Sequence, residues 1–210
     1  MRAVGRLSFD ALYDPIVALT MRERVWRGPL CEQVLATVPE GGTVLEVGAG
    51  TGAIAIRLAS SRRDARIVAI DGDEQILRRA RHKRGGYLVD WRAGLANALP
   101  VADGEADAVV MSLLLHHLGA SGKPAALREA MRVLRPGGYL HIADWGRPQD
   151  PIMNAMFFLL RLVDGFEQTT EHAAGRIPDL LRDAGLRLVT CQRQVRTTWG
   201  SLELLSARRP

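Results

Sequence analysis

The nine residues from Val44 to Gly52 have the types and spacing of a nucleotide-binding corner. An apolar run carries one acid, Glu46, and is followed by glycines at positions 48, 50 and 52. A glycine turn lets a ligand approach the backbone closely, because no Cβ atom is in the way. A helix that begins after such a turn directs free N–H groups at the ligand. We therefore expect a strand, a turn and a helix around a nucleotide.

Two acids distinguish the kinds of nucleotide. The spacing G-x-G-x-G departs from the G-x-G-x-x-G of dinucleotide sites, and no P-loop sequence is present. Asp71 ends the next apolar run, where an acid can accept hydrogen bonds from ribose hydroxyls. A carboxylate at Glu46 would repel a pyrophosphate but favour an ammonium and a sulfonium. These features favour S-adenosylmethionine. Two alternatives stay open: Glu46 orders the turn by accepting backbone N–H groups, and Asp71 caps the following helix.

The elements around these residues alternate between strands and helices. Continuous apolar runs predict buried parallel strands, and helical spacing recurs between them. Two extended runs joined by a short turn near the C-terminus predict a hairpin. The fold class is α/β, a doubly wound Rossmann-like sheet of about seven strands, mostly parallel, with an antiparallel edge hairpin and helices on both faces. The predicted strands are 43–47, 66–70, 87–92, 107–112, 139–143, 186–195 and 201–207.

We expect a single domain over residues 1–210. Residues 1–42 would form an N-terminal helical lid, interrupted at Asp14-Pro15, with a separate helical piece from Pro29 to Thr37. Residues 43–144 would form the cofactor-binding core, and residues 145–185 an insertion with helices beside the substrate site. Residues 186–210 would form the terminal hairpin.

The combined motifs resemble those of the class I S-adenosylmethionine-dependent methyltransferases. The similarity is greatest to the ubiquinone/menaquinone-biosynthesis C-methyltransferases and related small-molecule enzymes, and it extends over roughly Thr43 to Asp144. One position departs from the pattern: Leu95 stands where the family usually carries an acid toward the adenine amino group. A lost hydrogen bond there costs roughly 0.5–1.5 kcal/mol. The resemblance implies S-adenosylmethionine as cofactor and these contacts: Tyr13, Glu46, Gly48, Ala49, Gly50, Gly52, Asp71, Gly72, Leu95, Ala96 and Ser112.

Two histidines are the candidate catalytic residues. Methyl transfer from a sulfonium is an in-line displacement, so a base matters only if the acceptor must lose a proton. His116 and His117 follow the fourth predicted strand, whose carboxyl end borders the ligand crevice in such sheets. Ser112, in place of an acid or an Asn-Pro-Pro run, argues against metal-dependent catechol-type enzymes and base-amine methyltransferases. We expect no metal.

The insertion after the fifth predicted strand is rich in flexible and aromatic side chains. Such side chains suit an apolar substrate pocket, and they also suit core packing or a dimer contact. We expect a small, fairly apolar metabolite as substrate, and a homodimer is left open. The side chains concerned are Met153, Met156, Phe157, Phe158 and Leu160.

Composition sets the remaining expectations. The net charge of +5 comes with only two lysines, Lys83 and Lys123, which indicates a codon bias as much as a basic surface. The arginines from 78 to 84 should form a solvated face, so no nucleic-acid partner is expected. The two cysteines are far apart, and no signal peptide or membrane span is evident, which favours the cytoplasm. The alternative functions are an RNA or protein methyltransferase and a catalytically silent cofactor-binding module.

Overall fold

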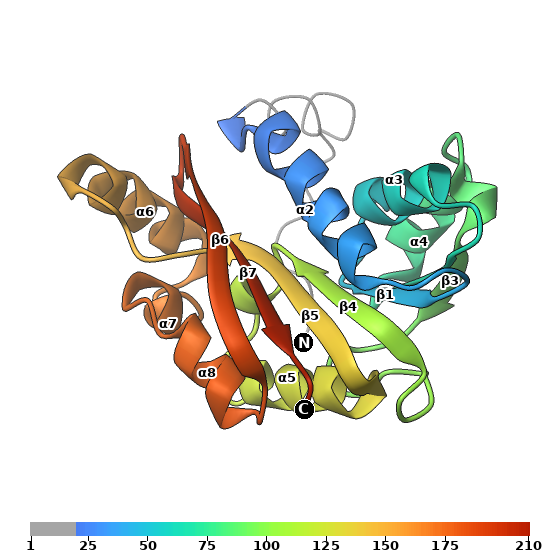
Figure 1. The fold of residues 1–210 in the computed structure, drawn as a ribbon. Coiled ribbons are helices and arrows are strands. Elements are labelled where there is room, and N and C mark those ends of the chain that lie inside the picture. The colour runs from blue at the N-terminus through green and yellow to red at the C-terminus, as the bar shows by residue number, and fades with distance from the viewer. Residues whose placement is uncertain (1–19) are drawn as a thin grey trace.

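A computed structural model describes residues 20–210 of the chain (Figure 1). One mixed sheet runs through it in the order β3-β2-β1-β4-β5-β7-β6. The pairs from β3 to β5 are parallel, and β7 is antiparallel to both β5 and β6. This confirms the predicted sheet with its antiparallel edge hairpin. The strands are β1 (Thr43–Val47), β2 (Arg66–Asp71), β3 (Asp90–Ala93), β4 (Ala106–Ser112), β5 (Leu134–Trp145), β6 (Arg187–Thr197) and β7 (Gly200–Arg208).

Helices cover both faces of this sheet, so it is doubly wound. The α2, α3 and α4 helices lie on one face, and α5 and α8 lie on the other (Figure 1). The helices are α2 (Glu23–Thr37), α3 (Ala53–Ser61), α4 (Glu74–Arg81), α5 (Gly122–Val133), α6 (Pro151–Asp164), α7 (Thr170–Ala173) and α8 (Ile177–Asp183). Two short 3-10 turns, η1 (Gly86–Leu88) and η2 (Leu115–His117), precede β3 and follow β4.

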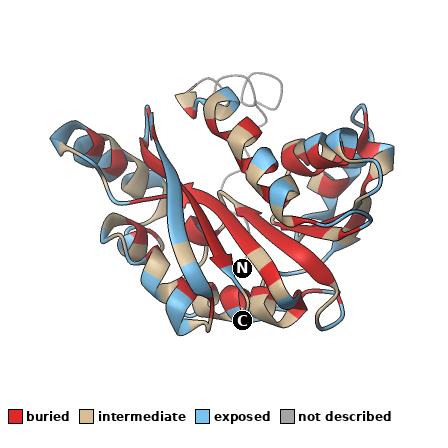
Figure 2. Ribbon diagram, in the orientation of Figure 1, coloured by how far each residue is buried: buried red, intermediate tan, exposed pale blue. Residues whose placement is uncertain are grey.

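The central strands are buried on both sides, as Figure 2 shows for β4 and β5. Successive side chains of a strand point to opposite faces. In β1, Val44 therefore joins the core beneath α2 and α3, whereas Leu45 joins the core over α5 and α8. Because both layers are apolar, most side chains of these strands are hydrophobic, and the strands do not alternate regularly between apolar and polar residues.

The predicted third strand is wrong in its first half. Residues 86–88 form η1, and the strand itself begins at Asp90. The Tyr87 side chain is 81% exposed. The Trp91 indole donates to the Gly86 carbonyl at 2.8 Å, which closes a turn ahead of the strand. Extended propensity at Tyr87 and Leu88 thus yields to this local side-chain bond.

The N-terminal helical region also differs from the prediction. The expected separate piece from Pro29 is part of one helix, α2, that begins at Glu23 and contains Pro29. Proline has no N–H for the carbonyl four residues earlier, which here belongs to Val25. The Arg193 guanidinium of β6 donates to that carbonyl at 3.2 Å. A donor distant in sequence therefore replaces the missing helical bond.

The fifth strand is longer than predicted. It starts at Leu134, which pairs with Ala106, and its register shifts before Tyr139 pairs with Ala108. The Arg-Pro-Gly-Gly sequence from 135 to 138 is therefore an irregular part of β5, and Gly137 has a φ of 81°. The predicted insertion helix, the following helix and the hairpin are confirmed as α6, α8 and β6–β7.

Candidate cofactor and active site

The glycine turn lies at the carboxyl end of β1, and its glycines serve different purposes. Gly50 and Gly52 have φ values of 51° and 75°, in the left-handed region. A Cβ atom at Gly52 would lie 2.2 Å from the Trp91 ring, so this position must stay small for packing. A Cβ atom at Gly50 would meet nothing within 4 Å. The backbone at Gly50 therefore borders open space that a ligand can enter.

Asp71 connects the end of β2 to this turn. Its Oδ2 accepts from the Gly50 amide at 2.8 Å, and its Oδ1 accepts from the Asp73 amide at 2.9 Å. A carboxylate offers about four lone-pair sites, so acceptor capacity is left for ribose hydroxyls. The cap of α4 is Asp73, whose Oδ1 accepts from Gln75 and Ile76. The alternative role of Asp71 as the helix cap is therefore wrong.

Glu46 is buried in β1 and faces α3. Its Oε2 accepts from the Ala55 amide at 2.8 Å. The helix needs this acceptor because its N-cap residue, Gly52, has no side chain. Burial raises the pKa of the Glu46 carboxyl to about 8, although the Ala55 amide and the nearby Arg27 act in the opposite direction. The predicted ordering role of Glu46 is thus present in the structure, and its contact with a cationic ligand stays a prediction.

The loop after β3 approaches the end of β2. Gly94 donates from its amide to the Asp71 carbonyl at 3.1 Å. The Leu95 side chain is 60% exposed, and one of its methyl carbons would be 3.2 Å from a Cβ atom at Gly72. Ala96 is half-buried beside it. An exposed leucine side chain at this place can make an apolar contact with the flat face of a purine, but it can form no hydrogen bond.

These features fit S-adenosylmethionine. The open backbone at Gly50, the acceptor capacity of Asp71 and the apolar surface of Leu95 lie along neighbouring strand ends. Gly48 and Ala49 bring the turn against β2, because both amides donate to the Ile70 carbonyl. Among the predicted contact residues, Tyr13 lies outside the described residues.

The segment after β4 borders the same turn. Ser112 is half-buried at the strand end, and Leu113 has a φ of 49°, which is unusual for a residue with a side chain. The Leu114 side chain would be 2.7 Å from a Cβ atom at Gly48. The histidine pair of η2 follows directly along the chain.

The two predicted histidines have different surroundings. His116 is 4% exposed, and its Nδ1 lies 2.7 Å from Asp144 Oδ1 at the end of β5. His117 is exposed, and its ring centroid is 4.0 Å from that of His116. His116 Nε2 is 3.8 Å from Asp164 Oδ2 on α6.

Asp144 is the buried acceptor around which this cluster forms. Its Oδ2 accepts from the Leu114 and Leu115 amides, at 3.1 and 2.8 Å. Its Oδ1 accepts from the Trp145 amide at 2.8 Å as well as facing His116. Burial by itself would raise the pKa of Asp144, but the charges of His116 and His172 and these donors hold it below its usual range.

Sequence reasoning missed three residues of this cluster. Asp144, Asp164 and His172 are distant in sequence from the histidine pair, and no local spacing joins them to it. His172 of α7 is fully buried, with Nδ1 2.7 Å from the Trp145 carbonyl, and burial lowers its pKa. An acid at the carboxyl end of the fifth strand was the available signal for Asp144.

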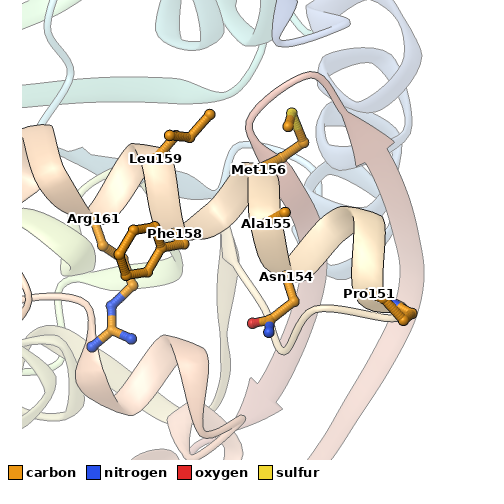
Figure 3. Close-up of a pocket in the computed structure, with 7 residues that line it drawn as sticks. All are labelled: Pro151, Asn154, Ala155, Met156, Phe158, Leu159 and Arg161. Carbon is orange, nitrogen blue, oxygen red and sulfur yellow. The ribbon is translucent and has the colours of Figure 1, made fainter.

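The predicted insertion residues divide between the core and a surface pocket. Met153 and Phe157 are buried, and the Phe157 ring packs 5.9 Å from Trp145. Met156 and Phe158 line a pocket of about 550 Å³ on the outward side of α6 (Figure 3). Leu160 is half-buried against the core. The full lining is Pro151, Asn154, Ala155, Met156, Phe158, Leu159 and Arg161.

Two further expectations concern the surface and metals. Arg78, Arg79, Arg81 and Arg84 are all exposed, as expected for a solvated face. Within residues 20–210, no group of three or more His, Cys, Asp or Glu side chains is arranged to hold a metal ion. In the same part of the chain, no helix is both long and apolar enough to cross a membrane.

The comparisons agree with the fold and the turn. Residues 44–138 match the family model described as a methyltransferase domain. The structure resembles a SAM-dependent methyltransferase from Aquifex aeolicus, with a TM-score of 0.64, 26% identity, and coverage of 86% of this chain and 89% of that one. Residues 44–138 are thus similar to a methyltransferase domain, and the fold is like that of the S-adenosylmethionine-dependent methyltransferase from Aquifex aeolicus. This confirms the predicted resemblance, and the family implies S-adenosylmethionine as cofactor.

Two other similarities are to a curated relative and to a solved complex. A mitochondrial 2-methoxy-6-polyprenyl-1,4-benzoquinol methylase from Leishmania donovani is 31% identical over 153 residues, which are 65% of this chain and 52% of the relative. The complex of the Haloferax volcanii Trm112 methyltransferase activator with a protein described as a methyltransferase gives a TM-score of 0.71 at 23% identity, covering 98% and 99% of the two chains. The chain spans about half the length of the curated relatives it matches.

Proposed function

We propose that this chain transfers a methyl group from S-adenosylmethionine to a small, fairly apolar metabolite. The observation that carries the proposal is the hydrogen bond between the ends of β2 and β1, in which Asp71 Oδ2 accepts from the Gly50 amide. The backbone at Gly50 borders open space. Asp71 would accept the ribose hydroxyls, Leu95 would contact the adenine, and the turn from Gly48 to Gly52 would face the methionine part. The cofactor supplies an electrophilic methyl group, and its sulfur keeps the bonding electron pair.

The chain's own residues would orient the acceptor and exclude water. Methyl transfer requires the acceptor atom to stand in line with the methyl carbon and sulfur, so most of the rate comes from positioning. The helical segment from α6 to α7 contributes Asp164 to the surroundings of His116. We propose that this segment, with residues 145–185, forms one side of the substrate site.

The small apolar acceptor is supported by the insertion and by a relative. The α6 helix of the insertion carries the apolar side chains Met156, Phe158 and Leu159 around a surface pocket (Figure 3), and its last residue, Asp164, lies beside His116. The Leishmania relative is named for a polyprenyl benzoquinol. We therefore favour a hydroxylated aromatic acceptor over an ionic one. The two free cysteines fit the proposed reducing location, the cytoplasm.

A screen of metabolites with methyl-labelled cofactor tests this proposal. We expect label in a hydroxylated aromatic compound and release of the demethylated cofactor. Calorimetry with the demethylated cofactor provides a separate test of binding. Absence of binding to the wild-type chain would contradict the proposal, and binding without turnover on any acceptor would favour the silent module.

A protein or RNA methyltransferase is the second candidate. It is supported by the fold shared with a chain of the complex that contains the Haloferax volcanii Trm112 methyltransferase activator. The exposed apolar side of α6, with Leu159, Leu162 and Val163, would then be a partner contact, or a homodimer contact. Light scattering of the purified chain and co-purification with a tagged copy distinguish these cases. Methylation of RNA or protein in the labelled screen would favour this candidate.

A further inference from the structure

We infer that Asp144 is a positioning residue that makes His116, and not His117, the base of the reaction. The inference rests on the proposed methyl transfer for its chemistry. Its structural part, the position of the proton on the His116 ring, stands without it. Asp144 at the end of β5 contacts His116 directly, at 2.7 Å between Oδ1 and Nδ1. His117 is exposed, and within the cluster its ring contacts the His116 ring.

The hydrogen bonds that Asp144 accepts determine the tautomer of His116. The Asp144 carboxylate accepts three backbone N–H groups, those of Leu114, Leu115 and Trp145. An ionised carboxylate has no proton to give, so the hydrogen bond to His116 requires Nδ1 to carry the proton. In the neutral ring the lone pair then lies on Nε2. This nitrogen, which faces Asp164 at 3.8 Å, is then the one ring nitrogen with a lone pair to take a proton from an acceptor O–H, N–H or C–H group.

The arrangement also holds the ring after proton transfer. When Nε2 takes the proton, the acceptor atom keeps the electron pair that attacks the methyl carbon, and His116 becomes an imidazolium. Asp144 stabilises this cation at Nδ1, and Asp164 lies 3.8 Å from Nε2. The groups that face His116 are therefore Asp144 from β5, Asp164 from α6, His117 from η2 and His172 from α7.

His172 does not compete for the same carboxylate. Its Nδ1 is 2.7 Å from the Trp145 carbonyl and 4.0 Å from Asp144 Oδ1. A carbonyl only accepts, so the Nδ1 proton of His172 goes to Trp145. Asp144 Oδ1 therefore makes its short contact with His116. The ring centroids of His172 and His116 are 6.2 Å apart.

The substitution Asp144→Asn tests the inference because it can replace the hydrogen-bond acceptor opposite His116 Nδ1 with a hydrogen-bond donor. If the new side-chain amide turns its oxygen to Leu114 and Leu115, it keeps both of these backbone hydrogen bonds, and its NH₂ group faces one backbone N–H, that of Trp145. In the other orientation, the NH₂ group faces two backbone N–H groups, so this orientation is less favourable. The favoured orientation points the amide NH₂ group at His116 Nδ1. The ring must then accept at Nδ1, and its proton moves to Nε2, where it blocks the base.

Long-range ¹⁵N–¹H NMR of the full chain, labelled at histidine, reads this proton directly. We expect wild-type His116 to carry its proton on Nδ1 at pH 8, and the Asp144→Asn variant to carry it on Nε2. The signals are assigned by their loss in His116→Gln. The matched control, Asp179→Asn, changes an exposed acid of α8 and should leave the His116 signals unchanged. A wild-type ring protonated on Nε2 overturns the inference without any need for a folded variant.

Kinetics on an acceptor found in the labelled screen form the second measurement. General-base loss lowers the rate by about 10²–10⁴-fold, so we expect kcat of Asp144→Asn to fall by about a hundredfold or more with KM nearly unchanged. If Asp144→Asn carries the His116 proton on Nε2 but keeps the wild-type kcat, His116 is not the base of the reaction. If no acceptor is methylated, the proposed function fails, while the NMR result still decides the role of Asp144.

Discussion

Asp71 and Gly50 form one structural unit, since the carboxylate that ends β2 accepts the amide of the turn that follows β1 at 2.8 Å. The acid expected at the ribose is therefore also a support for the backbone expected at the methionine part. We predict that Asp71→Ala weakens binding of the demethylated cofactor by about a hundredfold, because charged hydrogen bonds contribute roughly 1.5–3 kcal/mol each. Isothermal titration calorimetry measures the change.

The matched control for this prediction is Asp73→Ala. Asp73 is the N-cap of α4, so its loss should cost about 1 kcal/mol of stability. Cofactor affinity should stay within a few-fold of wild type. Equal losses of affinity in both variants would show that the loop was disordered and that Asp71 has no specific role.

Gly50 and Gly52 should separate binding from folding. Gly50→Ala meets open space, so only the left-handed backbone strain is expected, at about 1–2 kcal/mol. Gly52→Ala adds a clash with Trp91 and should cost about 3 kcal/mol or more. Urea unfolding measures these costs. Calorimetry should show that Gly50→Ala loses cofactor affinity, and a Gly50→Ala variant with normal affinity would remove this position from the site.

Glu46 should make the protein less stable as pH rises. Its folded pKa of about 8 lies above the unfolded value of 4.5, so its contribution is fully present below pH 4.5 and is lost as pH rises through 8. Each pKa unit corresponds to about 1.4 kcal/mol. Relative to Glu46→Gln, wild type should therefore lose a few kcal/mol between pH 4.5 and 8, measured by urea unfolding. Parallel curves for the two proteins would mean that Glu46 is ionised throughout.

His141 should have the opposite pH dependence. Burial lowers the pKa of His141 to about 4 from 6.5, so its contribution is present above pH 6.5 and is lost as pH falls toward 4. His141→Gln retains a partner for Thr37, whose hydroxyl lies 2.9 Å from Nε2. We expect acid to destabilise wild type more steeply than this variant, as followed by thermal unfolding at pH 4–7. Equal slopes would contradict the buried neutral ring.

Lys123 should anchor the insertion. This fully buried lysine donates to the carbonyls of Leu118 and Gln168 and pairs with Glu171 at 3.0 Å. Removing one member of a buried ion pair costs about 3–5 kcal/mol, so Lys123→Met should lower the free energy of unfolding by that amount. Lys83→Met, at the exposed lysine, is the control and should change stability by less than about 0.5 kcal/mol. Similar unfolding energies for the two variants would show that the buried pair contributes little.

The cofactor corner was predictable because its signals are local. A strand, a glycine turn and a helix follow one another directly, and Asp71 ends the next strand. Parallel strands align their carboxyl ends, so the sequence places Asp71 beside the turn even before the atoms are known. The same reasoning placed His116 and Ser112 at the adjoining strand end, together with the order of helices and strands.

Local patterns failed where a side chain completes a bond outside the regular backbone pattern. Pro29 interrupts a helical pattern in sequence, yet Arg193 supplies the missing donor and α2 continues. Tyr87 belongs to an extended run in sequence, yet the Trp91 indole closes η1 around it. In both cases, a side-chain bond outweighs a backbone preference of about 1–3 kcal/mol.

The sequence by itself determined the sheet, the glycine turn and the acid that ends the second strand, because strand and turn propensities act over a few neighbouring residues. Only the tertiary structure decided which histidine has a buried acid beside it. His116 and Asp144 are 28 positions apart, and they meet because β4 and β5 pair in parallel and end at the same edge of the sheet. The Asp144 carboxylate also accepts hydrogen bonds from three backbone amides, which fix its orientation. In that orientation its Oδ1 faces the His116 ring.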